Sequence, residues 1–187
     1  LSDASIENFY DLTVPNIKGP VYIYNFPGCT AHEVSPELIL KLRRKYSNIK
    51  GCKDTVKDFA HTRKICETVL PEFPDFEIYS GFDEFFVHNV MSGGAGCIGG
   101  LTNVCPELMA DWVKAVNAKD WDESAKIQRK VNKLMDMFEI CAPFLTAVKR
   151  ALLIQGVISN EYGSEPNVIA NDAEDAKIRG ILEAIKD

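Results

Sequence analysis

The fold can be inferred from Asn48-Ile49-Lys50-Gly51-Cys52-Lys53-Asp54-Thr55, a short stretch with the character of a β-strand. Lys53 stands at the end of that strand. An earlier strand-like stretch, Val21 to Asn25, carries Tyr24 near its own end, 29 residues before the lysine. Helix-forming sequence separates the two stretches, and strands joined by crossovers of that length pair in parallel. The sequence therefore predicts an α/β domain with Lys53 and Tyr24 at the C-terminal ends of parallel strands.

The alternation continues through the first half of the chain. We expect strands at 21–25, 49–53, 76–80 and 96–101, and helices at 4–10, 35–46, 56–69 and 83–91. Ser35-Pro36-Glu37 marks a helix start, because serine caps helices well and proline is favoured at the first helical position. After Pro106 only helical segments remain, at 107–117, 122–140, 143–155 and 172–185.

Four parallel strands raise a structural question about the sheet. They are too few to close a barrel, and a parallel sheet is normally covered on both faces. Two unpaired edges would also face water. The chain is thus expected to be either a compact four-stranded α/β domain or the back half of a larger (β/α) barrel.

Composition is that of an ordinary globular protein. The chain has 187 residues, of which 46% are hydrophobic and 26% charged, enough for one domain with a substantial core. A net charge of −6 without a basic stripe argues against a nucleic-acid partner. We find no signal peptide and no membrane-spanning apolar run, and so expect no membrane partner and a cytoplasmic location. The six cysteines form no C-x-x-C pair and are expected to be reduced.

Two motif classes that would imply a cofactor or metal can be set aside. Gly94-x-Gly96-x-x-Gly99 matches the dinucleotide fingerprint by letter, but a helix precedes it and a strand follows, the reverse of the required order. His32, His61 and His88 are scattered and show no metal-ligand spacing. We therefore expect neither a cofactor nor a metal.

Lys53 and Tyr24 suggest imine chemistry on a keto acid. A lysine amine can attack a carbonyl carbon, and a phenol can move the protons that the reaction requires. The alternatives are a lysine that extends from a strand end to solvent and a tyrosine that packs on the core, as most strand tyrosines do. Because side chains alternate along a strand, Tyr22 should share the face of Tyr24 while Ile23 points the other way.

Four spaced blocks carry a resemblance to a known family. They are Tyr22-Ile23-Tyr24-Asn25-Phe26-Pro27, Gly51-Cys52-Lys53-Asp54-Thr55, Ser80-Gly81-Phe82-Asp83-Glu84 and Gly94-Ala95-Gly96-Cys97-Ile98-Gly99-Gly100. In this order and spacing they resemble the dihydrodipicolinate synthase / N-acetylneuraminate lyase family of class I pyruvate-dependent aldolases.

The resemblance implies a (β/α)8 TIM barrel of which this chain supplies strands five to eight plus a helical C-terminal extension. Residues 1–105 would be the second half of the barrel, and residues 106–187 the last barrel helix with the extension. The family's first four strands, and its Gly-Thr-Thr-Gly-Glu type segment for the substrate carboxylate, have no counterpart here. The resemblance also implies a homotetramer or homodimer.

The resemblance further implies roles for individual residues. Lys53 would form the Schiff base with the keto carbon of a pyruvate-like substrate, and Tyr24 would relay protons. Tyr22 would fill space deeper in the barrel. The positions that would contact the substrate tail are Thr55, Gly81, Asp83, Glu84 and Gly100. From the residues alone, Asp83 and Glu84 could equally be acids favoured by a helix dipole, and Thr55 a helix cap.

Departures from the family pattern bear on the substrate. Dihydrodipicolinate synthases generally carry an arginine five residues after the relay tyrosine, where this chain has Cys29, and Gly100 stands where N-acetylneuraminate lyases usually have a serine. The resemblance thus implies an aldolase that cleaves a 2-keto-3-deoxy sugar acid, of the N-acetylneuraminate or 2-keto-3-deoxygluconate type, to pyruvate and an aldehyde. The alternatives are dihydrodipicolinate synthase-type condensation of pyruvate with an aspartate-derived aldehyde, and a non-catalytic truncated fragment.

Overall fold

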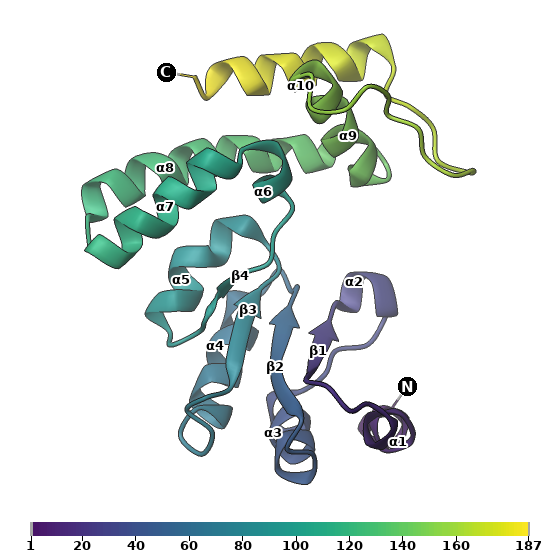
Figure 1. The fold of residues 1–187 in the computed structure, drawn as a ribbon, viewed down its shortest axis with the longest axis vertical. Coiled ribbons are helices and arrows are strands. Elements are labelled where there is room, and N and C mark those ends of the chain that lie inside the picture. The colour runs from purple at the N-terminus through teal and green to yellow at the C-terminus, as the bar shows by residue number, and fades with distance from the viewer. Residues whose placement is uncertain (1, 187) are drawn as a thin grey trace. The chain divides into compact units, whose positions relative to one another are not determined.

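Four parallel strands form the sheet of the first half of the chain. They are β1 (Val21–Asn25), β2 (Ile49–Asp54), β3 (Glu77–Ser80) and β4 (Gly96–Cys97), and they lie side by side in sequence order. A computed structural model describes residues 2–186 (Figure 1). It divides into two compact units, the first ending at Gly99 and the second beginning at Gly100. The prediction of an α/β fold with a parallel sheet is confirmed.

Helices connect the strands of the first unit. They are α1 (Asp3–Thr13), the 3-10 turn η1 (Val14–Asn16), α2 (Pro27–Thr30), α3 (Pro36–Lys45), α4 (Phe59–Val69), η2 (Asp83–Phe85) and α5 (Phe86–Met91). As expected, Ser35 caps α3, where its hydroxyl accepts a hydrogen bond from the Leu38 amide at 3.2 Å. Helix α4 begins three residues later than the expected start at 56, because Asp58 caps it by accepting from the Ala60 amide.

The two faces of this sheet have different surroundings. Ile23, Cys52 and Ile78 are fully buried and pack with apolar side chains of α3 and α4 in one core cluster. On the opposite face, Tyr22 and Tyr24 are 44% and 50% exposed. Since side chains alternate along each strand, Tyr22, Tyr24 and Lys53 share the more open face, whereas Cys52 and Asp54 lie on the covered face.

The second unit is helical. It contains α6 (Leu101–Val104), α7 (Pro106–Ala118), α8 (Trp121–Met135), the 3-10 turn η3 (Asp136–Glu139), α9 (Phe144–Ile154) and α10 (Asp172–Ala184). Strand β4 stops at Cys97 and α6 begins at Leu101, so the expectation of a strand through 96–101 was wrong beyond its first two residues. Only Gly96 and Cys97 have ladder partners on β3.

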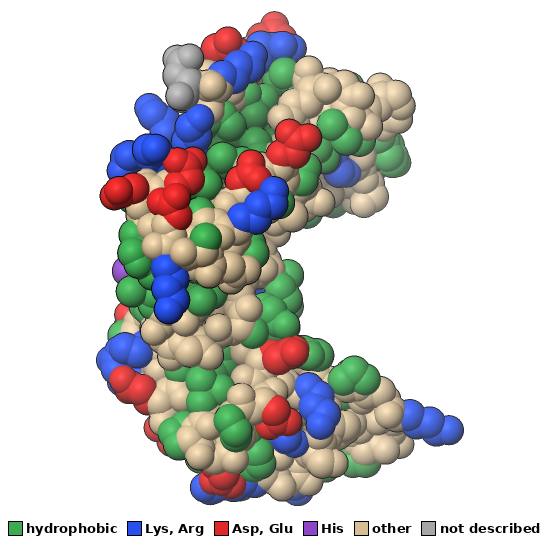
Figure 2. Space-filling model, turned by 60° about the vertical axis from the view of Figure 1, so that its left-hand side comes forward, with side chains coloured by type: hydrophobic (Ala, Val, Ile, Leu, Met, Phe, Trp, Pro, Cys, Tyr) green, Lys and Arg blue, Asp and Glu red, His purple; other side chains and the backbone are tan. Residues whose placement is uncertain are grey.

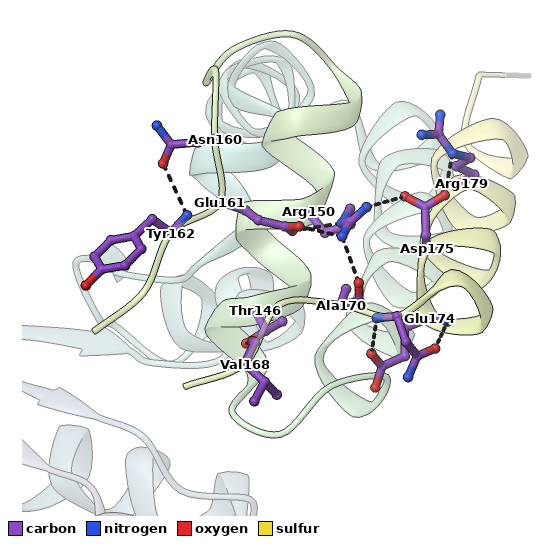
Figure 3. A network of polar contacts seen from close by, with 11 residues as sticks. Thr146, Arg150, Asn160, Glu161, Tyr162, Val168, Ala170, Glu174, Asp175 and Arg179 are labelled. Atoms are coloured by element: carbon purple, nitrogen blue, oxygen red, sulfur yellow. Dashed lines mark hydrogen bonds and ion pairs between the residues drawn. The ribbon is translucent and has the colours of Figure 1, made fainter. Parts of the chain in front are cut away.

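A partly buried arginine organises the connection from α9 to α10. Arg150 Nε donates to Glu161 at 2.8 Å, Nη1 donates to Asp175 at 3.1 Å, and Nη2 donates to the Ala170 carbonyl at 2.7 Å (Figure 3). Asn171 then begins α10 with a reciprocal capping arrangement with Glu174. The guanidinium group of Arg150 therefore holds the long segment between these helices at several points, together with hydrogen bonds from Lys149 to the Tyr162 carbonyl and from Thr146 to the Val168 carbonyl.

Charges of both signs are spread over the surface. On the face that Figure 2 shows, lysine and arginine side chains lie among aspartate and glutamate side chains. Among the helices of residues 2–186, none has the combination of length and apolar character that a membrane span needs.

Candidate active site

Lys53 and Tyr24 lie together at the C-terminal ends of neighbouring strands. They are direct ladder partners of β2 and β1, and the Lys53 amine sits 4.4 Å from the centroid of the Tyr24 ring. Phe26 stacks on that ring at a centroid distance of 5.8 Å. A lysine head group over an aromatic face is attracted by the quadrupole of the ring, a cation–π interaction. The structure thus brings together the amine and the phenol that the sequence singles out.

A buried polar hub lies behind this pair, on the covered face of the sheet. The Asp54 carboxylate accepts hydrogen bonds from Asn25 at 2.7 Å, from Thr62 at 2.6 Å and from His61 Nδ1 at 3.0 Å. Asn25 also accepts from the Val34 amide at 3.0 Å. Because Asn25 and Asp54 directly follow Tyr24 and Lys53, the hub fixes the strand ends that carry the candidate catalytic groups.

The hub shifts the ionisation of its histidine. Burial by itself would lower the pKa of His61, but the hydrogen bond and negative charge of Asp54, with the charge of Glu33, outweigh it, so the pKa of His61 is raised. His61 Nε2 lies 3.5 Å from Glu33. The charged imidazolium is therefore favoured by carboxylates on both sides of the ring.

A second polar cluster shares the open face with Lys53. The Tyr22 hydroxyl donates to Glu77, and the Tyr79 hydroxyl donates to the same carboxylate oxygen at 3.1 Å. Between Tyr22 and Glu77 lies Gly51, whose backbone leaves room for the Tyr22 ring, since a Cβ there would come within 2.7 Å of it. We call Tyr22, Glu77 and Tyr79 the polar belt.

Tyr22 bears on the expectation drawn from the family resemblance. It shares the face of Tyr24, as strand alternation requires, while Ile23 is buried behind it. Its ring leans across Gly51, and its hydroxyl ends at Glu77. In the part of the chain described, Tyr22 is therefore a hydrogen-bonded member of the polar belt as well as a bulky side chain.

Thr55 and Gly81 are in direct contact just beyond the strand ends. A Cβ at Gly81 would lie 1.8 Å from the Thr55 hydroxyl oxygen, so only glycine fits beside that threonine. The Thr55 hydroxyl is buried and has no hydrogen-bond partner among the described residues. A buried hydroxyl of this kind is a suitable contact for a polar group of a ligand.

Asp83, Glu84 and Gly100 occupy different surroundings. Asp83 is buried, and its carboxylate lies so close to Gly99 that a Cβ there would come within 2.4 Å of it. Glu84 is partly exposed in η2. Gly100 belongs to the second unit, where it directly precedes α6. A Cβ added to Gly100 would lie 3.0 Å from the Phe138 ring.

The thiols of Cys52 and Cys97 in the sheet are not set up as nucleophiles. Burial raises the pKa of Cys97 to about 12, and the pKa of Cys52 lies well above its usual value for the same reason. Such thiols stay protonated near neutral pH and are poor nucleophiles. Within residues 2–186, no group of three or more His, Cys, Asp or Glu side chains is placed to hold a metal ion.

Sequence reasoning did not anticipate the hub or the polar belt. The members of the hub are far apart in the chain, and Asp54 reads only as a neighbour of Lys53. A signal for the belt was present: Glu77 and Tyr79 stand two residues apart in a strand and so share a face. A charged residue inside an otherwise apolar strand is the feature that could have identified it.

The dihydrodipicolinate synthetase family matches residues 1–185. YagE of Escherichia coli K12, provisionally named a 2-dehydro-3-deoxy-D-gluconate aldolase, is 26% identical over 186 residues, which cover 100% of this chain and 62% of YagE. YjhH of the same strain, provisionally named a 2-dehydro-3-deoxy-D-pentonate aldolase, is 27% identical over 180 residues, which cover 96% of this chain and 60% of YjhH.

Solved structures give the same result. The crystal structure of YagE, a prophage protein of the dihydrodipicolinic acid synthase family in complex with pyruvate, matches with a TM-score of 0.95 and 26% identity over 100% of this chain and 62% of that one. Dihydrodipicolinate synthase from Thermotoga maritima shares the fold at a TM-score of 0.91 and 23% identity, over 99% of this chain and 62% of that one. This chain therefore spans about three-fifths of the length of these relatives.

The fold and the site define an α/β protein with a parallel sheet and a lysine at a strand end. The chain belongs to the dihydrodipicolinate synthetase family.

Proposed function

We propose that this protein is a Schiff-base-forming aldolase that cleaves a 2-keto-3-deoxy sugar acid to pyruvate and an aldehyde. The observation that carries the proposal is the Lys53 amine, 4.4 Å from the centroid of the Tyr24 ring on the neighbouring strand end. Family membership and two relatives named as aldolases of such sugar acids support it. The solved pyruvate complex of YagE is consistent with a pyruvate-like moiety as the group that Lys53 would bind.

The reaction would proceed through an imine on Lys53. The amine adds to the keto carbon, Tyr24 donates its phenol proton to the hydroxyl of the resulting carbinolamine, and water leaves, so that a cationic imine and a phenolate remain. The Tyr24 phenolate then takes the proton from the substrate hydroxyl as the neighbouring carbon–carbon bond breaks, and the bonding electrons move into an enamine. Protonation of the enamine and addition of water then release pyruvate and restore the amine.

The other site residues have supporting roles in this proposal. Thr55, Gly81, Asp83, Glu84 and Gly100 would contact the hydroxylated tail of the substrate. Residues 1–105 would be strands five to eight of a (β/α)8 barrel with their helices, and residues 106–187 the last barrel helix and the C-terminal extension. A homotetramer or homodimer is the assembly that we propose on the basis of the family. No cofactor takes part in the scheme.

Reductive trapping tests the proposal directly. The protein is incubated with pyruvate and borohydride and its mass is measured. We expect a pyruvate adduct on wild type, none on Lys53→Ala, and an undiminished adduct on Lys50→Ala, which removes a lysine from the same strand. An unmodified wild-type mass, or an adduct that persists in Lys53→Ala, would contradict the assignment.

Two alternatives are separated by further measurements. Condensation of pyruvate with an aspartate-derived aldehyde is disfavoured by Cys29, which offers no cation for a second carboxylate, and a coupled synthase assay should show poor activity. A non-catalytic fragment would show no adduct although a thermal melt and size-exclusion profile report a folded protein. Among sugar acids, the names of YagE and YjhH favour the 2-keto-3-deoxygluconate type over N-acetylneuraminate, which an aldehyde-release assay with each substrate would decide.

A further inference from the structure

The polar belt places a carboxylate close to Lys53. Gly51 is the ladder partner of Glu77, and Lys53 is the ladder partner of Tyr79, so Lys53 and Glu77 are diagonal neighbours on one face. From the usual strand spacing and rise, their Cα atoms are about 8 Å apart. Tyr79, which donates its hydroxyl to Glu77, thus stands in the same row as Lys53 and Tyr24.

The negative charge of the polar belt lies on the Glu77 carboxylate. Both phenols donate to the same oxygen of Glu77. The hydrogen bond to Glu77 raises the pKa of Tyr22 to about 12, so this phenol remains a donor at any ordinary pH. A phenol that stays protonated adds no charge of its own. The polar belt is therefore a single carboxylate that accepts hydrogen bonds from the Tyr22 and Tyr79 hydroxyls.

The Glu77 carboxylate lies on the same strand face as Lys53. The titratable side chains around Lys53 are Tyr22 and Tyr24 on β1, Glu77 and Tyr79 on β3, and Cys97 on β4. Asp54 follows Lys53 directly but lies on the covered face with the hub. Asp83 and Glu84 follow the end of β3 and approach Cys97.

We propose that the polar belt is a fixed counter-charge for Lys53, with Glu77 as a positioning residue that favours the cationic form of whatever nitrogen Lys53 carries. The inference rests on the proposed function, in which that nitrogen becomes a cationic imine. An opposite charge on the same strand face stabilises a cation by Coulomb attraction, which weakens with distance and with added salt.

The consequence for the chemistry depends on pH. A neutral amine, a ketone and a proton give a cationic imine and water, so the nitrogen gains a charge and Glu77 favours the product. A protonated amine and a ketone give the cationic imine and water with no further proton, so the nitrogen is cationic on both sides and Glu77 favours neither. The belt therefore stabilises the imine selectively at alkaline pH, which a purely structural role would not do.

Competitive labelling tests the counter-charge without any substrate. Limiting acetic anhydride is applied at neutral pH and low ionic strength, and the acetylation rate of Lys53 is read by mass spectrometry. In Glu77→Gln we expect about twofold faster acetylation, because loss of the negative charge enlarges the uncharged fraction of the amine. The increase should shrink in added salt. Glu67→Gln, which removes an exposed carboxylate on α4, should leave the rate unchanged.

Tyr22→Phe separates charge from packing. It keeps the Glu77 charge and removes one of the two phenol donors, so its labelling rate should stay closer to wild type than that of Glu77→Gln. An unchanged rate in Glu77→Gln with a wild-type melting temperature would overturn the proposal. Equal rate changes in Tyr22→Phe and Glu77→Gln would overturn it as well, since packing would then explain both.

Pyruvate trapping supplies the second readout. Glu77→Gln should lower the adduct yield at alkaline pH and leave the yield near neutral pH unchanged. Equal loss at both pH values would contradict the counter-charge. If wild type forms no adduct at all, the proposed function fails, and the labelling experiment still decides whether Glu77 and Lys53 are coupled.

Discussion

Asp54 illustrates how one buried side chain can organise a site without entering it. It accepts three side-chain hydrogen bonds, from Asn25, His61 and Thr62, while being almost completely shielded from water. Removing an acceptor in such a hub leaves buried donors unpaired, which costs far more than the net contribution of one hydrogen bond. The hub therefore explains why the strand ends bearing Tyr24 and Lys53 are well defined.

A pH-dependent stability follows from His61. Its pKa is raised in the folded state, so its ion pair stabilises the protein fully below about pH 6.5, the value for an unfolded histidine. That contribution is lost as the pH rises through the higher folded pKa. Urea unfolding should show that the stability advantage of wild type over His61→Gln declines as the pH rises across this window. If the difference in unfolding free energy between wild type and His61→Gln stayed constant or grew with pH, the ion pair between His61 and Asp54 would be contradicted.

At the scale of elements, helix α10 contains a glycine that can be replaced by a residue of higher helix propensity. Gly180 lies within this helix, and a Cβ added there would meet no heavy atom within 4 Å. Glycine in a helix interior is less favourable than alanine by about 1 kcal/mol. Gly180→Ala should therefore raise the free energy of unfolding by about that amount, measured by urea denaturation.

The contrasting glycine supplies the control. Gly81→Ala places a Cβ 1.8 Å from the Thr55 hydroxyl oxygen and should lower stability, as overpacking does by about 1–3 kcal/mol. If Gly180→Ala were destabilising, the open space beside that helix would be misassigned.

Some elements could be predicted from sequence and others could not. Strand β1 has the expected bounds, Val21 to Asn25, because alternating large side chains and the flanking proline define it locally. Helices α2 and α6, four residues each, were missed, since one turn of helix leaves no periodic pattern to detect. The pairing of Lys53 with Tyr24 was predictable from strand ends. The hub was not, because its contacts span seven to 29 residues of sequence.

At the scale of the whole molecule, each unit has its own stabilising centre. In the helical unit it is a set of buried apolar side chains that includes Trp112, Leu134 and Ile178. Arg150, whose side chain is 17% exposed, adds ion pairs with Glu161 and Asp175 (Figure 3). In the sheet-containing unit it is the apolar cluster behind the strands. Local unfolding of either unit would therefore respond to different substitutions.

Arg150→Met should be strongly destabilising. It leaves the largely shielded Glu161 carboxylate without its partner, and the cost of about 3–5 kcal/mol for breaking a fully buried ion pair is the upper limit for this partly exposed one. Hydrogen exchange of the α9 and α10 amides, together with urea denaturation, would measure the effect. Arg129→Met, at an exposed arginine of α8, should change the free energy of unfolding by no more than about 0.5 kcal/mol. Similar effects of the two substitutions would show that the Arg150 network is dispensable.

The two-sided character of the sheet has a consequence for how this protein can change. Ile23, Cys52 and Ile78 anchor the strands from the helix side, so positions 22, 24, 77 and 79 can be varied in a combinatorial library without disturbing that anchorage. Structural anchorage and chemical variation are thereby assigned to opposite surfaces of the same few strands, which makes this scaffold a practical starting point for engineering new amine-based activities.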